Sequence, residues 1–241
     1  MPEWSKGTVC KTVKPWVQIP LYPPNLGFVM NENRGFKRKT IIKTINHKLE
    51  EWIKTIDDEA LREQVKKDVI VTGGAIVSML QGTLPNDYDV YFSNVETALK
   101  VAQYYLSKLP ESQNDKVSKC EAKIIDNRVK ILIKSAGVAS ETCNQADYDY
   151  FEYMPDNSSE YYLNKCMHSD KGKYSVVCMT TNAISLSDDI QAILRFTGSA
   201  DEIHENYDFV HCTNSFHYDK DGNGMLTLRQ EALESILAKE L

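Results

Sequence analysis

The organisation of this chain is clearest in residues 71–92, which read VTGGAIVSMLQGTLPNDYDVYF. An apolar run ends at Gly73-Gly74, and glycine lets the backbone turn tightly and approach a ligand closely. The pattern predicts a helix from Ala75 to Gln81, then a turn, then a strand from Tyr88 to Phe92. A helix that follows two glycines directs its free amides and the positive end of its dipole at one spot. This arrangement predicts a seat for a polyphosphate.

Two carboxylates accompany the second predicted strand. Asp87 and Asp89 are separated by one residue, so their side chains leave the same face while Tyr88 and Val90 face the core. Adjacent carboxylates repel each other unless a cation lies between them, and oxygen ligands suit Mg²⁺ or Mn²⁺. We therefore expect a metal at Asp87 and Asp89, beside a nucleoside triphosphate bound at the glycine pair.

The segment resembles the signature of the nucleotidyltransferase superfamily, and is most similar to the head domain of class II CCA-adding enzymes and poly(A) polymerases. The resemblance rests on the glycine pair, the Gln81-Gly82 turn and the two aspartates. It implies an α/β (α+β) fold with a mixed sheet flanked by helices. It also implies a reaction that moves a nucleoside monophosphate from a triphosphate to an acceptor hydroxyl and releases pyrophosphate. A weaker match, Thr180-Thr-Asn-Ala183, implies that Asn182 contacts the nucleotide sugar.

A third carboxylate commonly completes the superfamily site, and Asp208 is the candidate for this catalytic and metal-binding role. It lies in the apolar stretch Tyr207–Cys212, predicted as a strand, where an unpaired charge is costly. Pairing of Asp208 with Arg195 is an equally good interpretation. Ser78, one turn into the predicted helix, either contacts a phosphate or bonds its own turn.

Several positions depart from the class II pattern. Val77 and Ser78 stand where those enzymes have arginine and aspartate, and Val176–Cys178 replaces Arg-Arg-Asp. The chain also resembles nucleotidyltransferase-like proteins of large bacteriophages through Gln191-x-x-Leu-x-Arg-Phe196 and Tyr207-Asp-Phe-Val-His-Cys212. Two functions stay open. The favoured one is a transferase acting on a tRNA-like RNA 3′ end. The alternative is a catalytically inactive nucleotide- or RNA-binding module, a phage factor acting on a host pathway.

Charge is unevenly distributed along the chain. The net charge is −6, but residues 1–48 carry +7 and the remainder −13. Residues 1–39 are basic and rich in proline, which predicts an extended arm, and residues 40–241 form the predicted nucleotidyltransferase-like domain. Residues 155–172 are polar and irregular and predict an insertion or lid. The arm is either a solvated basic segment or an RNA contact, made by Arg34, Lys37, Arg38 and Lys39.

The composition, 42% apolar and 26% charged, is typical of a folded globular protein. No apolar run reaches the roughly 18 residues of a membrane span, and Pro2, Glu3 and Lys6 replace a signal-peptide core. We therefore expect no membrane contact and a cytoplasmic location, in the host cytoplasm if the gene is phage-borne. Six scattered cysteines predict reduced thiols. The EF-hand-like stretch Asp219–Gln230 lacks a glutamate at its twelfth position, so it favours a hairpin over a calcium site.

Overall fold

The computed structural model describes residues 35–109, 120–136, 149–153 and 172–239. Arg34, most of the predicted arm and nearly all of the predicted insertion lie outside the described residues. The helices are α1 (Arg38–Lys54), α2 (Glu59–Asp68), α3 (Gly74–Leu80), α4 (Val95–Ser107), the 3₁₀ helix η2 (Val210–Cys212), α6 (Ala200–His204) and α7 (Gln230–Ala238). The strands are β1 (Val69–Thr72), β2 (Tyr88–Phe92), β3 (Cys120–Ile125), β4 (Arg128–Ala136), β5 (Asp149–Tyr153), β6 (Val176–Met179), β7 (Ala183–Leu186), β8 (Ile190–Thr197), β9 (Ser215–Tyr218) and β10 (Gly224–Thr227).

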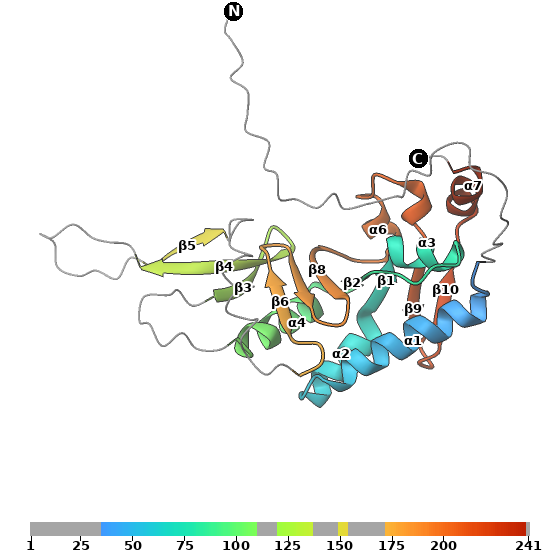
Figure 1. Ribbon diagram of the computed structural model, residues 1–241. Coiled ribbons are helices and arrows are strands. Elements are labelled where there is room, and N and C mark those ends of the chain that lie inside the picture. The colour runs from blue at the N-terminus through green and yellow to red at the C-terminus, as the bar shows by residue number, and fades with distance from the viewer. Residues whose placement is uncertain (1–34, 110–119, 137–148, 154–171, 240–241) are drawn as a thin grey trace, which may run out of the picture. The chain divides into compact units, whose positions relative to one another are not determined.

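Two sheets organise these elements (Figure 1). Seven strands form a mixed sheet in the order β10-β9-β1-β2-β8-β7-β6, and β3, β4 and β5 form an antiparallel sheet of their own. In the larger sheet β2 and β8 run parallel, whereas the other neighbouring pairs run antiparallel. This mixed sheet with flanking helices confirms the predicted α/β (α+β) class.

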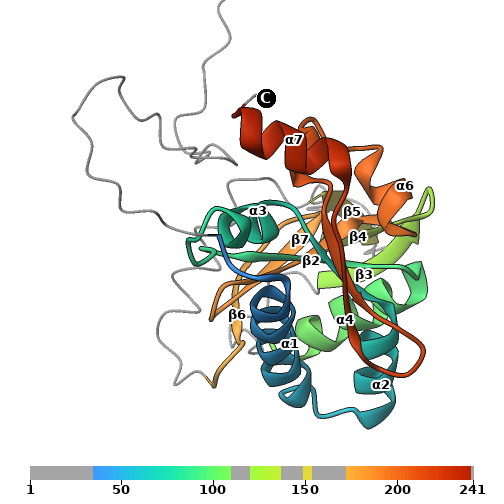
Figure 2. The same ribbon diagram turned by 90° about the vertical axis from the view of Figure 1, so that its right-hand side faces the viewer.

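The two faces of the larger sheet have different partners. Helices α1, α2 and α4 lie on one side, and α6 and α7 lie on the other (Figures 1 and 2). Val71 of β1 and Val90 of β2 belong to the main core with residues of α1, α2 and α4. Because strand side chains alternate between faces, Thr72 and Asp89 lie on the opposite face. A smaller apolar cluster on that face contains Ile70, Tyr91, Ala183, Ile193 and Ile203.

Helix α1 is an amphipathic helix on the core face of the larger sheet. Its apolar residues recur every three or four positions and are buried against the sheet. Near its C-terminal end, the Trp52 indole donates a hydrogen bond of 2.7 Å to the buried hydroxyl of Tyr105 on α4. This bond fixes α1 against α4 on the core face, away from the carboxylates of β2.

The prediction of a strand over Tyr207–Cys212 is wrong. The segment is a turn followed by η2, because local hydrogen bonds satisfy its backbone. The Tyr207 amide donates to the His204 carbonyl at 3.0 Å, and the Cys212 amide donates to the Phe209 carbonyl at 3.2 Å. Strand β7 cannot be predicted from the sequence, because its four residues are too few for a clear alternation pattern.

Among the described residues, no helix is both long enough and apolar enough to cross a membrane.

Candidate functional site

Gly73 joins β1 to α3 in a backbone conformation that glycine alone adopts readily, with φ +86° and ψ −150°. Its amide donates a hydrogen bond of 3.1 Å to the Cys212 carbonyl, which ties the turn to η2. A β-carbon added at Gly73 would lie 3.1 Å from Asp89 Oδ2 and 3.7 Å from Tyr207 Oη. The glycine turn, the β2 carboxylate and the loop after α6 therefore meet at one place. At Gly74 an added β-carbon would meet no atom within 4 Å.

Asp87 and Asp89 flank Tyr88 at the start of β2. No side chain of the described residues forms an ion pair or a hydrogen bond with the partly buried Asp89. Burial, followed by the negative charge of Asp87, raises the pKa of Asp89 to about 7. Loss of hydration and the charge of Asp189 also raise the pKa of Asp87. The described residues thus supply no cation to keep the two carboxylates ionised side by side.

Asp87 and Asp89 offer carboxylate oxygens, which are ligands that Mg²⁺ and Mn²⁺ prefer. Within the described ranges, no group of three His, Cys, Asp or Glu side chains could hold a metal ion. Mg²⁺ is usually held by one or two carboxylates and completes its shell with water and substrate phosphates. Asp87 and Asp89 suit that mode of binding, in which the nucleotide brings the remaining oxygen ligands.

The predicted third carboxylate, Asp208, does not join this pair in the structure. Asp208 is exposed in the turn between α6 and η2, and none of the described residues joins Asp87 and Asp89 as a third ligand. The side chain near Asp89 is that of the preceding residue, Tyr207. On the parallel strand β8, the residue in register with Asp89 is Gln191, an amide. A role for Asp208 stays a prediction.

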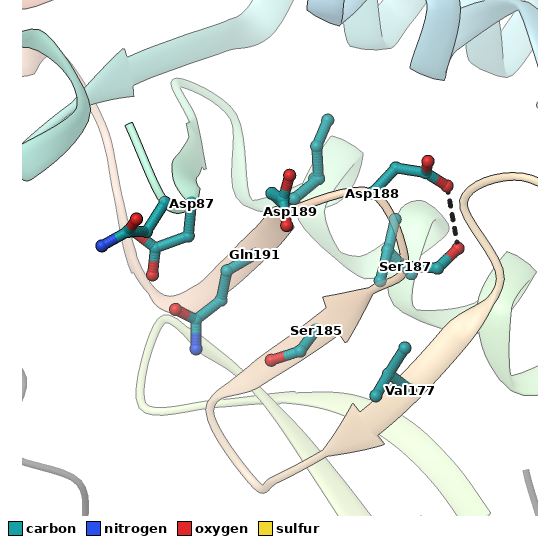
Figure 3. A pocket seen from close by; sticks show the side chains of 10 residues that line it. Asp87, Val177, Ser185, Ser187, Asp188, Asp189 and Gln191 are labelled. Atoms are coloured by element: carbon teal, nitrogen blue, oxygen red, sulfur yellow. Dashed lines mark hydrogen bonds between the residues drawn. The ribbon is translucent and has the colours of Figure 1, made fainter. Parts of the chain in front are cut away.

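A pocket of about 350 Å³ opens beside Asp87 (Figure 3). Its floor continues the row of polar residues that runs across the sheet from Asp89 on β2 to Gln191 on β8 and Ser185 on β7. Its rim is the β7–β8 turn, where Asp188 and Asp189 have φ values of +59° and +60°. Aspartate tolerates this left-handed conformation better than most residues. The turn therefore adds negative charge to the rim beside Asp87.

The structure places Ser78 and Asn182 in different surroundings. Ser78 lies within α3, and its carbonyl accepts hydrogen bonds from the Thr83 amide and hydroxyl that close the end of the helix. Asn182 is exposed in the β6–β7 turn, and its carbonyl accepts a bond of 2.7 Å from the Leu194 amide. That turn lies at the end of β7 away from the pocket. The structure does not bring Asn182 to the carboxylate pair, so its sugar contact stays a prediction.

Of the predicted RNA contacts, Arg38 has a structural role. Its guanidinium donates a hydrogen bond of 2.8 Å to the Leu226 carbonyl of β10. Lys37 and Lys39 are exposed at the start of α1. Together with Arg38, these two lysines are the described part of the predicted RNA contact.

A buried polar network holds the glycine turn in place. The Thr72 hydroxyl shares its hydrogen between the carbonyls of Asn214 (2.8 Å) and Cys212 (3.2 Å) and lies 2.7 Å from Nε2 of His204. Burial and the nearby Arg229 lower the pKa of His204 to about 4, so the ring is neutral at pH 7. Nε2 is then the donor to the Thr72 oxygen. Sequence reasoning missed this network because its members are distant along the chain.

We expect Thr72→Val to lower the free energy of unfolding by about 1–3 kcal/mol, because it leaves the His204 donor and two carbonyls without their partner. Thr72→Ser keeps the hydroxyl and is the control, which should lose less. Urea denaturation of the three proteins measures the difference. A Thr72→Val variant as stable as the wild type would contradict the assignment of this network.

A comparison with protein-family models matches residues 43–239 to a model described as Gabija anti-defense 2 family protein, or Gad2. The chain belongs to the Gabija anti-defense 2 family. The match includes the glycine turn, both carboxylates and the Thr72 network, so the family model covers every described part of the site. Neither the comparison with curated proteins nor the comparison with solved structures found a match.

Proposed function

We propose that this chain is a phage anti-defense factor that acts in the host cytoplasm as a metal-dependent nucleotidyltransferase, with its site at Gly73, Asp87 and Asp89. The family description supports an action against the Gabija defence. The observation that supports the chemistry is Asp89, a partly buried carboxylate beside a glycine turn, without a cation from the described residues. Such a carboxylate is costly to the fold, and a divalent cation brought by a nucleotide compensates it.

The proposed nucleotidyl transfer uses the arrangement of Gly73, Asp87 and Asp89 as follows. The phosphates lie over Gly73, whose missing side chain lets them approach the backbone, and Asp87 and Asp89 would hold the cation on the β2 side. A bound Mg²⁺ or Mn²⁺ supplies positive charge for the attacking and leaving oxygens. The acceptor oxygen bonds to the α-phosphorus, and the bond from this phosphorus to the α–β bridging oxygen breaks. Pyrophosphate leaves with the bonding electrons, and the acceptor proton passes to water.

The favoured acceptor is an RNA 3′ end, with Lys37 and Lys39 as exposed charges for its backbone. The described residues that line the pocket beside Asp87 include Asp188 and Asp189 and no basic side chain, although Lys48 lies 3.8 Å from Asp189 and offsets part of its charge. The remaining negative charge of the rim repels a phosphodiester backbone. An RNA acceptor therefore enters from another side. Hydroxyls of proteins and small molecules are acceptors to test alongside RNA.

A nucleotide-binding module without transferase activity is the second candidate. The position of Gln191 favours it, because the strand next to β2 offers an amide in register with Asp89 where a carboxylate could complete the metal site. Such a module would act by sequestering a nucleotide or an RNA that the defence needs.

Incubation of the purified full chain with each α-labelled nucleoside triphosphate, Mg²⁺ or Mn²⁺, pooled RNA and host protein separates the two candidates. Transfer of label by the wild type, and not by the double variant Asp87→Ala, Asp89→Ala, supports the transferase and identifies the acceptor class. Calorimetric binding of nucleotide without transfer supports the binding module. Failure to bind any nucleotide or RNA would exclude both.

Plating of phage on cells that carry the Gabija defence tests the biological part of the proposal. The wild-type chain should restore plaque formation, and the double variant should not. If both restore plaques equally, the anti-defense action does not depend on the carboxylates.

A further inference from the structure

Tyr207 reaches the candidate site from the turn after α6. Its ring packs between Tyr91 of β2 and His204 of α6, with ring centroids 6.2 Å and 5.2 Å away. Its hydroxyl oxygen lies 3.7 Å, and Asp89 Oδ2 lies 3.1 Å, from the point that a β-carbon at Gly73 would occupy. The phenol and the carboxylate therefore border the same small space over the glycine.

The Tyr207 hydroxyl is buried and has no hydrogen-bond partner among the described residues. The Tyr91 and Thr72 hydroxyls are near enough to interact with it, but neither has the distance and angle of a hydrogen bond to it. The Thr72 hydrogen is already shared between two carbonyls. An unpaired buried hydroxyl lowers stability, and phenylalanine would fill the same volume without that cost. This points to a use for the hydroxyl outside the fold.

The phenol keeps its proton under all physiological conditions. Burial raises the pKa of Tyr207 well above its usual range, and the neighbouring Tyr91 and Asp89 act in the same direction. A neutral phenol is a hydrogen-bond donor. It can therefore satisfy an oxygen that approaches Gly73 without adding a positive charge to the site.

We propose that Tyr207 is a nucleotide-contact residue, whose hydroxyl donates a hydrogen bond to a non-bridging phosphate oxygen of the nucleotide over Gly73. This inference rests on the proposed function, because it needs phosphates at the glycine turn. Asp89 and Tyr207 have different roles at this space. The carboxylate receives the cation, and the phenol receives a phosphate oxygen that points toward the protein.

Calorimetric titration of the full-length chain with ATP and Mg²⁺ tests the contact. Tyr207→Phe should weaken ATP binding by about 10-fold to 100-fold, the usual worth of a hydrogen bond to a charged group. Its melting temperature should stay equal to that of the wild type or rise. Tripolyphosphate with Mg²⁺ should lose affinity for the variant by a similar factor, whereas adenosine binding should not change.

Tyr218→Phe is the matched control. The Tyr218 hydroxyl is also buried without a partner, but its residue belongs to the main core on the opposite face of the sheet. Removing it should leave ATP affinity unchanged. A loss of affinity in Tyr218→Phe equal to that in Tyr207→Phe would mean that general loosening explains both, and would overturn the inference.

The remaining outcomes separate this inference from the proposed function. If the wild type and Tyr207→Phe bind ATP equally, the contact is wrong while the nucleotide site stands. If the wild type binds neither ATP nor any other nucleoside triphosphate with Mg²⁺ or Mn²⁺, the proposed function fails and the inference fails with it.

Discussion

Replacement of Asp89 by asparagine is expected to lower the rate of nucleotidyl transfer by about 1000-fold or more. The amide has nearly the same shape but no charge, so it cannot hold the cation that offsets the charge of the reacting phosphates. Steady-state label transfer at saturating nucleotide and metal measures the loss. Asp221→Asn, the same change at an exposed position of the β9–β10 hairpin, is the control and should keep the wild-type rate. Transfer by Asp89→Asn within tenfold of the wild type would remove Asp89 from the mechanism.

The same substitution should make the metal-free protein more stable above neutral pH. The pKa of Asp89 is about 7 in the folded chain, above its ordinary value, because burial disfavours the ionised form. The stabilisation by the neutral carboxyl is therefore complete below about pH 4 and is lost as the pH rises through about 7. The loss is on the order of 4 kcal/mol. The Asp89→Asn variant does not undergo this loss of stability, because its amide does not ionise.

Urea denaturation in the presence of a chelator, at pH 5 and at pH 8, measures this effect. The free energy of unfolding of Asp89→Asn should exceed that of the wild type clearly at pH 8 and much less at pH 5. The difference between the two proteins isolates Asp89 from the other titrating groups. A difference that does not change with pH would show that burial does not hold Asp89 in its neutral form.

Gly73→Ala is the substitution with the second largest expected effect. Its backbone has φ +86° and ψ −150°, a conformation that costs an alanine about 1–3 kcal/mol. The new methyl group would also stand 3.1 Å from Asp89 Oδ2, in the space assigned to the phosphates. We expect a lower melting temperature and a loss of transfer of about 100-fold or more, because small displacements of reacting groups have effects of that size.

Gly74→Ala separates strain from ligand contact. Gly74 lies in α3, and an added β-carbon there would meet nothing within 4 Å. Alanine is the better helix former, so the melting temperature should be unchanged or higher. Any loss of nucleotide affinity in this variant is then caused by a clash between the new methyl group and the bound nucleotide. Equal melting temperatures for Gly73→Ala and the wild type would contradict the strained turn.

Local sequence predicted those parts of the site that lie within one continuous segment. Gly73, Asp87 and Asp89 belong to one continuous unit of a strand, a helix and a second strand. The spacing of apolar residues predicts these three elements in this order. Tyr207 could not be predicted in the same way. The apolar pattern of residues 207–212 predicts a strand and makes Asp208 the candidate. The turn observed there instead brings the side chain of Tyr207 close to Gly73.

The remaining parts of the site depend on contacts between distant segments. Nothing near Thr72 in the sequence indicates that its hydroxyl meets His204 and Asn214. The importance of Gln191 likewise appears only from its register with Asp89, which requires the pairing of β2 with β8. The fold class could be predicted because it depends on the alternation of strands and helices, and not on which strands pair.

The parallel pairing of β2 with β8 determines when the candidate site can form during synthesis of the chain. Tyr88 pairs with Ile190, and Gly73 is held by Cys212, so both sides of the site wait for residues from the far half of the chain. Contacts between segments this distant form slowly and late in folding. A ribosome that has made only the first half of the chain has already produced Gly73, Asp87 and Asp89, but β8 and the Cys212 carbonyl, which hold β2 and the glycine turn, are still missing. The candidate site is therefore complete only after the C-terminal strands emerge, and a fragment that ends before β8 has the motif without the site.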